Sequence, residues 1–269
     1  MSSQEKPIQP RILSIAGSDS SGGAGIQADT KTITVLGGYA MTAITAVTAQ
    51  DTTGVHKIAL LEPGMVAAQV TACLQDIGAD AVKIGMLGSP EIAEAVLGAL
   101  EGFEGPVVFD PVMVATSGAS LADEATIASF ERWLTRAEVV TPNLPELEAL
   151  AGHSCPTGQD VIEAALAIAR KHGCAVLAKG GHSADDLMVD RLVFPHDAVA
   201  EWEGERIDTP HTHGTGCTMS AAIATLLGHG QDLRHAVELS RKFVRQAIEA
   251  APGFGKGNGP LGHNRVGRG

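Results

Sequence analysis

The sequence predicts an α/β fold in which a central, mostly parallel sheet is flanked by helices on both faces. Short apolar runs alternate with segments whose apolar residues recur at helical spacing, from residue 12 to residue 179. Parallel strands need such crossover segments between them, and helices usually supply them. The composition, 44% apolar and 19% charged, is typical of a compact globular protein and not of a disordered chain.

The elements alternate along the first two thirds of the chain. The runs expected to form parallel strands are 12–16, 39–48, 80–84, 106–109, 138–141 and 175–179. A glycine-rich turn at 17–25 precedes the first helix, over 26–36, and another helix is expected over 122–136. Three more helices are expected from apolar residues that share one face: Val66, Val70, Cys73, Leu74 and Ile77; Ile92, Val96, Leu97 and Leu100; and Ile162, Ala165, Leu166 and Ala169.

After Lys179 this alternation ends. Residues 187–194 and 200–207 predict a hairpin, and helices over 215–227 and 233–250 close the chain. Because aromatic residues make up only 3% of the chain, the core must be built from Ala, Val, Ile and Leu. We find no internal repeat or linker, so we expect a flexible tail over 1–10 and a single domain over 11–269.

Charge and hydropathy exclude several kinds of partner. The formal net charge is −12 and no basic stripe is present, which argues against nucleic acid and anionic membranes. No apolar run approaches the roughly 18 residues of a membrane helix, and no basic-then-apolar leader opens the chain. The four cysteines lack a C-x-x-C pair, so we expect free thiols and a cytoplasmic protein.

Polar or glycine-rich segments follow most of the expected strands. They are 17–25, 50–51, 85–86, 110–111, 142–143 and 179–181. In an open parallel sheet, ligands bind outside the carboxyl ends of the strands. The sequence therefore predicts that these separate segments surround one crevice.

The segment from His211 to Thr218 opens an expected helix with small residues. Backbone N–H groups at such a helix start point outward and, with the helix dipole, form an anion hole suited to a phosphoryl group. Cys217 lies in the first turn, where the same field is expected to lower the pKa of its thiol. A thiolate there can accept a proton from a hydroxyl that attacks phosphate. The alternative is a small buried cysteine with glycines that only allow close packing.

His211, His213 and Cys217 also raise two other hypotheses. As metal ligands they lack a fourth partner, and their spacing matches no common zinc pattern. As a Cys–His nucleophile pair they lack an orienting third member. We therefore favour the anion hole.

Two further segments carry polar groups near the crevice. Glu146, one turn into a helix opened by Asn143, can hold magnesium through water, or can simply complement the helix N-terminus. The Gln50 carboxamide presents a donor beside an acceptor, as an aminopyrimidine edge requires, or is an ordinary polar strand end. The 17–25 turn contains neither the G-x-G-x-x-G fingerprint nor a Walker loop, which excludes the commonest nucleotide folds.

Together these segments resemble the ribokinase-like superfamily and, within it, the hydroxymethylpyrimidine/phosphomethylpyrimidine kinase family of thiamin biosynthesis. The resemblance runs from Arg11 to His263. It is carried by AGSDSSGGAGIQAD (16–29), ITAVTAQ (44–50), KIGML (83–87), DPVMV (110–114), TPNLPE (141–146), KGGH (179–182) and THGTGCT (212–218). The order and number of these segments make the resemblance specific, although each alone is weak.

The resemblance implies a fold, an activity and a set of site residues. The fold is ribokinase-like, and the activity transfers the γ-phosphoryl of ATP, with Mg²⁺, to 4-amino-5-hydroxymethyl-2-methylpyrimidine and then to its monophosphate. Partners other than these small molecules are limited to a second copy in a homodimer. The implied residues are Cys217 as base with Gly214, Thr215 and Gly216 as anion hole; Gln50, Asp29, Ala24, Met86 and Val112 for the pyrimidine; Lys179, Asn143 and Thr212 for ATP; and Glu146 and Asp110 for the metal.

Two positions bear on related specificities. Some pyridoxal kinases of this branch carry a cysteine where this chain has Ala115, which disfavours pyridoxal or pyridoxine as the substrate but leaves it as the alternative. At Thr116 many relatives carry lysine; if that lysine covers phosphate, its absence either weakens the contacts with ATP or is compensated elsewhere. A non-catalytic pyrimidine-binding regulator is the third hypothesis, and the segments around Cys217 and Glu146 argue against it.

Overall fold

A nine-stranded sheet organises the computed structural model of the chain, which describes residues 9–115, 118–119, 121–180 and 187–267. The strands are β1 (Arg11–Asp19), β2 (Tyr39–Asp51), β3 (Gly54–Leu60), β4 (Ala81–Ile84), β5 (Val107–Phe109), β6 (Val139–Val140), β7 (Ala175–Ala178), β8 (Leu187–Val193) and β9 (Val199–Glu205). Their order in the sheet is β3-β2-β1-β4-β5-β6-β7-β8-β9. The six strands from β2 to β7 in this order are parallel, whereas β3, β8 and β9 pair antiparallel.

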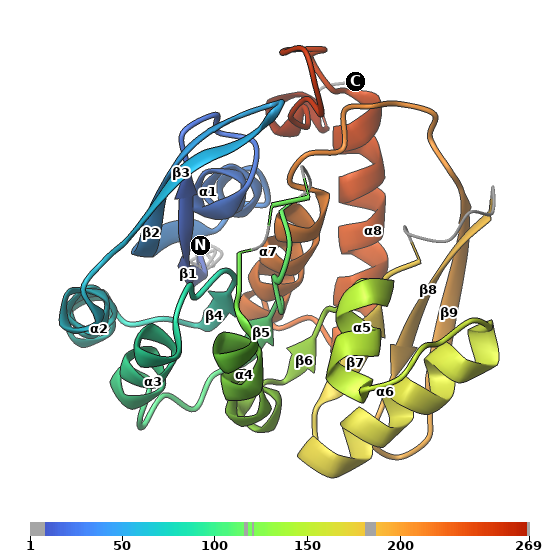
Figure 1. The fold of residues 1–269 in the computed structure, drawn as a ribbon, viewed down its shortest axis with the longest axis horizontal. Helices are drawn as coiled ribbons and strands as arrows, with labels where there is room; N and C mark the ends of the chain where they lie inside the picture. Colours follow the sequence, from blue (N-terminus) through green and yellow to red (C-terminus); the bar gives the residue numbers. More distant parts are fainter. Residues whose placement is uncertain (1–8, 116–117, 120, 181–186, 268–269) are drawn as a thin grey trace, which may run out of the picture.

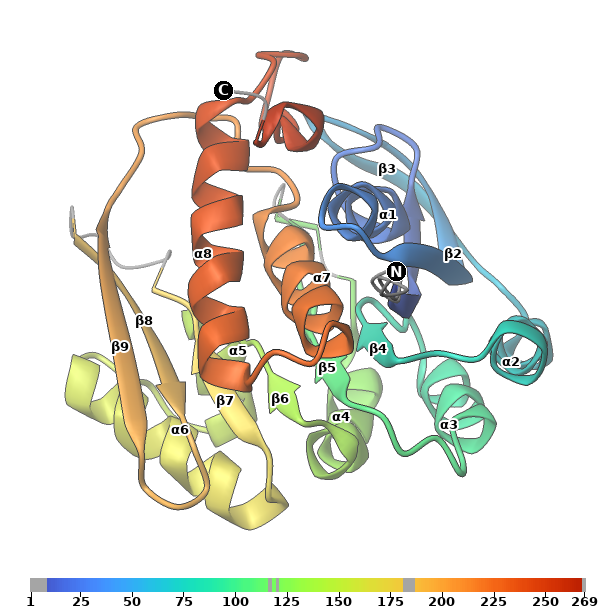
Figure 2. The same ribbon diagram turned by 180° about the vertical axis from the view of Figure 1, so that it is seen from behind.

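Helices cover both faces of the sheet and make a three-layer sandwich (Figures 1 and 2). On one face lie α2 (Pro63–Ala72), α3 (Pro90–Ala99), α4 (Glu124–Arg136), α5 (Leu144–Ala151) and α6 (Gly158–His172). On the other face lie α1 (Gly25–Val35), α7 (Thr215–Gly228) and α8 (Leu233–Glu249). The α/β fold class with helices on both faces, expected from the alternating pattern, is confirmed.

Alternation along the central strands divides the core between the two faces. Leu13 and Ile15 of β1 pack toward α2 and α3, whereas Ile12 packs toward α1 and α7. Val107 and Phe109 of β5 similarly face one layer and Val108 the other. Because both faces are covered, apolar residues of these strands are buried on both sides of the sheet, as is usual in parallel sheets.

The structure differs from the sequence expectations at a few places. β3 was not expected, because its alternation is weak and most of its residues are exposed. The helix predicted through Ile77 changes to a π-helical turn at Cys73–Ile77, and Ile77 is exposed instead of packed in the core. Pro10 was assigned to the tail, but it is buried and its carbonyl accepts a hydrogen bond from Tyr39 N at 2.7 Å.

Some sequence expectations fall on residues outside the described part of the chain. These are the tail over 1–8, Thr116, and the residues after Gly180 up to Asp186. Within the described residues, the four cysteines are free, as expected. None of the helices in that part combines the length and the apolar character needed to cross a membrane.

Candidate active site

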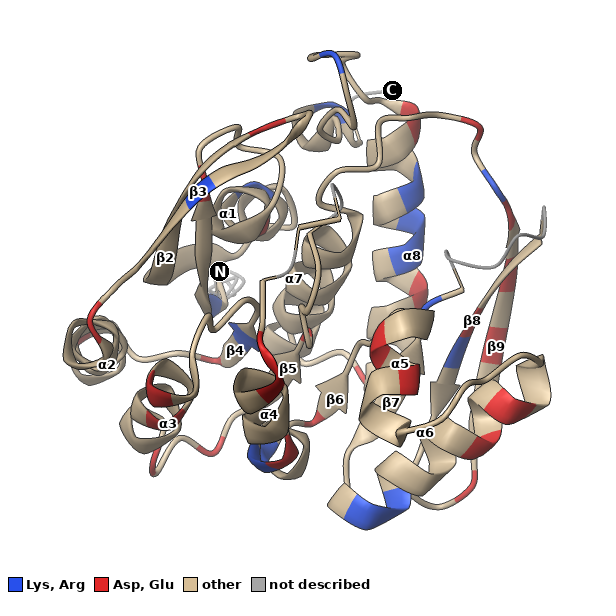
Figure 3. Ribbon diagram, viewed as in Figure 1, with Lys and Arg blue, Asp and Glu red and all other residues tan. Residues whose placement is uncertain are grey.

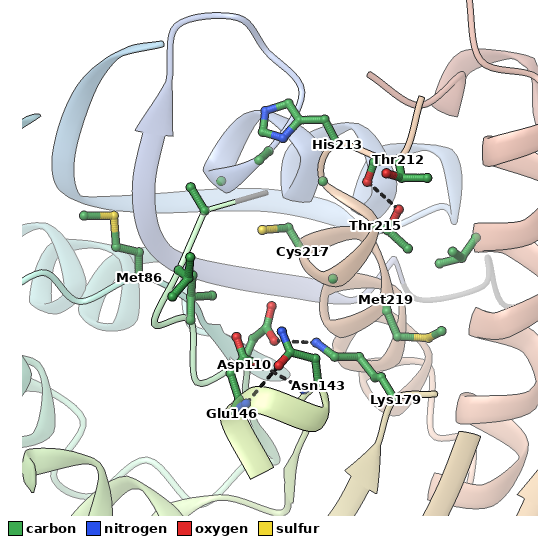
Figure 4. Close-up of a pocket in the computed structure, with 18 of the residues that line it drawn as sticks. Met86, Asp110, Asn143, Glu146, Lys179, Thr212, His213, Thr215, Cys217 and Met219 are labelled. Carbon is green, nitrogen blue, oxygen red and sulfur yellow. Dashed lines mark hydrogen bonds and ion pairs between the residues drawn. The ribbon is translucent and has the colours of Figure 1, made fainter. Parts of the chain in front are cut away.

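One cavity of about 1220 Å³ opens at the carboxyl ends of the parallel strands (Figure 4). It contains residues from the ends of all six parallel strands, among them Gln50, Met86, Asp110, Asn143 and Lys179. The crevice predicted from the polar strand ends is thus present. Thirteen of the candidate site residues line it: Cys217, Gly214, Thr215, Gly216, Gln50, Ala24, Met86, Val112, Lys179, Asn143, Thr212, Glu146 and Asp110.

The N-terminus of α7 forms one wall of this cavity. Gly214, the residue before the helix, has a φ of 86°, and a Cβ there would lie 1.9 Å from the carbonyl oxygen of Gly23. Only glycine fits that position, because it needs both the left-handed backbone and the close approach. Thr215 Oγ1 donates to Thr212 O at 2.7 Å and so fixes the turn into the helix. The first N–H groups of α7 have no partner within the helix, which suits an anion.

Cys217 lies in this first turn with its side chain in the cavity. The sequence predicted a lowered thiol pKa, and this prediction is wrong: burial raises the pKa of Cys217 to about 11. The positive charge of Lys83 and a hydrogen bond from the Gly25 N–H oppose that rise, whereas Asp29 and Asp110 add to it. Desolvation therefore outweighs the field of the helix. The thiol is neutral in the substrate-free protein at neutral pH.

Lys179 and Asp110 form a buried ion pair beside the anion hole at the start of α7. Lys179 Nζ lies 3.0 Å from Asp110 Oδ1, and Thr141 Oγ1 donates to the same oxygen at 3.1 Å. Burial alone would raise the pKa of Asp110, but Lys179 and Lys83 hold it below its usual value. Gly216 leaves room for this pair, since a Cβ there would lie 3.3 Å from Lys179 Nζ. The ammonium is therefore held next to the anion hole.

Asn143 and Glu146 lie beside this ion pair and begin α5. Asn143 Oδ1 accepts from Glu146 N at 2.9 Å, and Glu146 Oε2 accepts from Asn143 N at 2.8 Å, so the two form a capping box. The alternative in which Glu146 complements the helix N-terminus is thus confirmed, and it does not exclude a bound cation. Burial raises the pKa of Glu146 to about 7, with Asp110 adding to the rise and Lys179 opposing it. Because burial makes the Glu146 carboxyl costly to ionise, a cation bound nearby would stabilise its charged form.

The residues near Asp110 and Glu146 fit a magnesium ion bound mainly through water and phosphate. Among the described residues, no three His, Cys, Asp or Glu side chains gather into a metal-binding group. Mg²⁺ typically uses one or two carboxylates and completes its shell with water and substrate phosphates. Two buried carboxylates beside an anion hole are such a donor set. The zinc-type hypothesis for His211, His213 and Cys217 finds no support in the described part of the chain.

The opposite end of the cavity holds the residues expected to contact a pyrimidine. Ala24, Met86, Val112 and Gln50 all line it, and Gly17 is closely packed against Met86, whose sulfur would lie 3.1 Å from a Cβ there. The methionine and valine supply apolar surface, and Gln50 supplies the polar edge. This is the usual composition of a small-molecule pocket.

Asp29 does not line the cavity, contrary to the expectation. Its side chain is fully buried, with Oδ2 2.8 Å from Lys83 Nζ and accepting from Ser14 Oγ at 2.6 Å. Lys83 does line the cavity, although the ammonium itself is fully buried. Asp29 thus reaches the site only through Lys83. Lys83 stands in the KIGML segment (83–87), but no role could be predicted for it, because an isolated lysine in an apolar strand does not reveal its partner.

Two more residues of the site were missed or assigned differently. Asp19 accepts hydrogen bonds from the N–H groups of Ser21, Gly23 and Ala24, and so shapes the glycine-rich turn. His213 Nε2 lies 2.9 Å from Asp19 Oδ2, and both side chains are buried. His213 therefore joins the start of α7 to the turn after β1. The role of Asp19 could not be predicted, because a loop that folds around a carboxylate shows only a polar turn in its sequence.

The cavity continues past Lys179 to α8. Its apolar lining there is Met188, Ile207, Met219, Val244 and Ile248. Arg241, Lys242 and Arg245 of α8 (Figure 3) also line the cavity, and each is paired with a carboxylate: Arg241 with Asp190, Lys242 with Glu238 and Arg245 with Glu249. The apolar lining suits a flat apolar group. The residues expected to contact the pyrimidine and this apolar lining belong to one cavity, which Cys217 and the anion hole also line.

Comparison with known proteins agrees with this site. Residues 19–262 match the family model of phosphomethylpyrimidine kinase. The chain is 42% identical over 267 residues to the thiamine biosynthesis multifunctional protein ThiED of Corynebacterium glutamicum, covering 97% of this chain and 35% of that protein. It is 41% identical over 256 residues to the hydroxymethylpyrimidine/phosphomethylpyrimidine kinase of Bacillus subtilis, covering 94% of each.

A solved structure extends the similarity to the fold. Pyridoxal kinase of Bacillus subtilis in complex with ADP has a TM-score of 0.89 and 33% identity, covering 97% of this chain and 100% of that one. The chain spans about a third of the multifunctional relative but nearly the whole of both Bacillus subtilis kinases. The ribokinase-like architecture expected from the motifs is confirmed. The chain belongs to the phosphomethylpyrimidine kinase family.

Proposed function

We propose that this chain transfers the γ-phosphoryl group of ATP to the hydroxymethyl group of 4-amino-5-hydroxymethyl-2-methylpyrimidine, and then phosphorylates the monophosphate to the diphosphate. The observation that carries the proposal is the position of Cys217 and the α7 N-terminus between two compartments of one cavity. Gln50, Met86 and Val112 suit an aminopyrimidine on one side. Lys179 and the apolar lining beside α8 suit a nucleotide on the other. The named relatives support this substrate class.

The side chains divide the work of the transfer among them. The Cys217 thiolate accepts the proton of the substrate hydroxyl as that oxygen attacks the γ-phosphorus and the bond to the ADP oxygen breaks. Its raised pKa makes the thiolate scarce but also makes it a stronger base than an ordinary thiolate. The N–H groups at the start of α7, with Lys179, bear the negative charge of the transferring group. Asp110 and Glu146 are the residues that would hold Mg²⁺, which when bound would neutralise charge on the ATP phosphates.

Product analysis tests the proposed activity directly. The protein is incubated with MgATP and the hydroxymethylpyrimidine, and the products are identified by mass spectrometry. Appearance of the monophosphate followed by the diphosphate is the expected result. Stoichiometric pyrimidine binding without consumption of ATP would instead indicate a non-catalytic regulator.

A parallel reaction with pyridoxal tests the second candidate function. The fold similarity to a pyridoxal kinase favours this candidate, whereas Ala115 in the cavity lining disfavours it. We expect the pyrimidine to be turned over with the higher kcat/KM. Pyridoxal phosphate as the sole product would retain the Cys217 chemistry but overturn the substrate and the role of Gln50.

Glu146→Gln is expected to weaken the apparent affinity for Mg²⁺ by about tenfold and to flatten its pH dependence. The Glu146 pKa of about 7 means that this carboxyl binds a cation better as pH rises through 7. In the parent protein the half-saturating Mg²⁺ concentration should therefore fall from pH 6 to pH 8. Glutamine also completes a capping box, so the melting temperature should stay close to the parent value. If the half-saturating Mg²⁺ concentration changed with pH to the same extent in both proteins, Glu146 would be excluded from the ion site.

We also propose that the chain pairs with a second copy through β3. This edge strand has exposed residues at successive positions, including Ile58 and Leu60, which are 37% and 48% exposed. An apolar edge strand of this kind is usually covered by a partner. Sedimentation equilibrium of the parent and of Leu60→Asp tests the proposal: a dimer that the substitution dissociates is expected, and a parent monomer contradicts it.

A further inference from the structure

His213 lies between the residues that shape the anion hole and the residue expected to recognise the pyrimidine. Its Nε2 atom is 2.9 Å from Asp19 Oδ2 and 3.3 Å from Gln50 Nε2. Thr48 Oγ1 lies on the other side of the Gln50 amide, 3.1 Å from its Oε1, and also 3.1 Å from the carbonyl of Ser18. The carboxamide is therefore held between an imidazole and a hydroxyl, and all four side chains line the cavity.

The contacts that join Asp19, His213, Gln50 and Thr48 can be satisfied by only one arrangement of their hydrogens. Burial alone would raise the pKa of Asp19, but hydrogen bonds from His213, from the Ser21 side chain and backbone, and from Ala24 lower it, so Asp19 is ionised. An ionised Asp19 only accepts, and therefore His213 Nε2 must carry a hydrogen. The Gln50 amide nitrogen also carries only donors, so it cannot face the same Nε2. The amide must turn over and present Oε1 to His213.

The turned amide completes a consistent chain of donors and acceptors. His213 Nε2–H is shared by Asp19 Oδ2 and Gln50 Oε1, Gln50 Nε2–H donates to Thr48 Oγ1, and the Thr48 hydroxyl donates to Ser18 O. The amide oxygen and nitrogen have nearly the same size, so the turn leaves the heavy-atom distances in place. One lone pair on Oε1 and one hydrogen on Nε2 then remain for a ligand in the cavity.

We propose that His213, anchored by Asp19, is a specificity-determining residue that locks the Gln50 carboxamide in the orientation that accepts a 4-aminopyrimidine and rejects a 4-oxopyrimidine. The proposal rests on the proposed function. A 4-aminopyrimidine offers an N–H donor beside a ring-nitrogen acceptor, whereas the 4-oxo compound offers an acceptor beside a ring N–H donor. Because the 5-hydroxymethyl group must point toward Cys217, the 4-oxo ring cannot turn over to restore the match.

Two glycines show that the site is built around the imidazole. A Cβ on Gly23 would lie 2.3 Å from His213 Cδ2, so this position leaves room for the ring. A Cβ on Gly214 would meet the carbonyl of the same Gly23. The imidazole is therefore fixed by packing as well as by Asp19, as an orienting residue requires.

Equilibrium binding of two ligands tests the proposal. Titration calorimetry without ATP measures Kd for the hydroxymethylpyrimidine and for its 4-oxo analogue. The parent is expected to prefer the amino compound by at least about 100-fold, since the wrong pattern leaves buried groups unpaired. His213→Leu keeps the volume but removes the donor, and should reduce that preference at least about tenfold because the amide can now turn. His213→Gln retains an N–H near the Nε2 position and should restore most of the preference.

A double-mutant cycle separates this role from a structural one. Gln50→Ala alone should raise Kd for the amino compound at least about tenfold. Adding His213→Leu to Gln50→Ala should change Kd less than about twofold, because His213 acts through the amide. Additive losses would overturn the proposal, as would an unchanged amino/oxo preference in His213→Leu. If His213→Leu does not fold, Gly23→Ala, which pushes the ring aside, replaces it in the cycle.

A control variant and the parent protein distinguish failure of this inference from failure of the proposed function. Gly54→Ala, in the hairpin beyond Gln50, meets no atom within 4 Å and should bind like the parent. A parent that does not bind the pyrimidine would overturn the proposed function and, with it, this inference. A parent that binds and phosphorylates the pyrimidine but shows no amino/oxo preference would overturn the inference alone.

Discussion

Cys217→Ala is expected to lose about 100- to 10,000-fold in kcat, the usual contribution of a general base, while still binding the pyrimidine. The thiol lies in the first turn of α7, where the hydroxyl of one ligand and the γ-phosphate of the other are expected to meet. Alanine removes the proton acceptor but none of the groups around Gln50. Turnover at saturating substrates and calorimetric binding of the pyrimidine measure the two effects separately.

The control for this variant is a cysteine outside the cavity. Cys73, at the end of α2, is free and is not among the residues that line the cavity, so Cys73→Ala should keep the parent kcat. Normal turnover by Cys217→Ala would show that the transfer needs no side-chain base and that positioning and charge neutralisation suffice. Equal losses in kcat and pyrimidine binding would instead indicate that the cysteine only packs the site.

The raised pKa of Cys217 also predicts how the thiol reacts. With a pKa of about 11, about one Cys217 side chain in a thousand is a thiolate at pH 8. Alkylation of Cys217 by iodoacetamide should therefore be slow at pH 8 and rise about tenfold per pH unit up to pH 10. Peptide mass spectrometry measures the rate at this cysteine alone. Rapid labelling at pH 7 would restore the original expectation from the helix dipole.

Local and periodic features of the sequence were enough to predict the fold. Runs such as 175–178 are apolar at consecutive positions because β7 is covered on both faces, and the β8–β9 hairpin follows from its change of pattern. β3 could not be predicted from hydrophobic patterning, because this exposed edge strand lacks a buried apolar face. The turn at Cys73–Ile77 was missed because helical periodicity does not register a change in winding.

The residues that line the cavity could be predicted where their positions depend on strand ends and glycine turns, and less well where they depend on buried partners. Lys179, Asn143 and Gln50 lie where the parallel topology requires. The error on Cys217 has a single physical cause: the sequence shows a helix start but not how deeply the thiol is buried. The Asp19–His213 contact joins residues far apart in sequence, and no local pattern pairs them.

Lys83→Met is expected to cost about 3–5 kcal/mol in the free energy of unfolding, because it leaves the Asp29 carboxylate buried without its partner. Both side chains are fully buried and their charged atoms lie 2.8 Å apart. Burial alone would lower the pKa of Lys83, but Asp29, Cys217 and Asp110 raise it above its usual value, so the lysine is charged. Urea unfolding measures the loss. The same substitution at Lys171, in a pair with Glu131 that is more than 60% exposed on both sides, should change stability by less than about 1 kcal/mol.

Neutralising both partners separates the structural role of Lys83 from its effect on Cys217. In Asp29→Asn/Lys83→Met no buried charge is left unpaired and Ser14 keeps an acceptor, so at least half of the lost stability should return. Activity should not return with it. Lys83 opposes the rise in the Cys217 pKa more strongly than Asp29 adds to it, so removing both charges still makes the thiolate rarer than in the parent. We expect kcat to stay below the parent value and alkylation of Cys217 at pH 9 to be slower than in the parent, by a smaller factor than in Lys83→Met alone. A double variant with restored stability, parent kcat and parent alkylation rate would mean that the buried pair holds β1, α1 and β4 together and does nothing for the thiol.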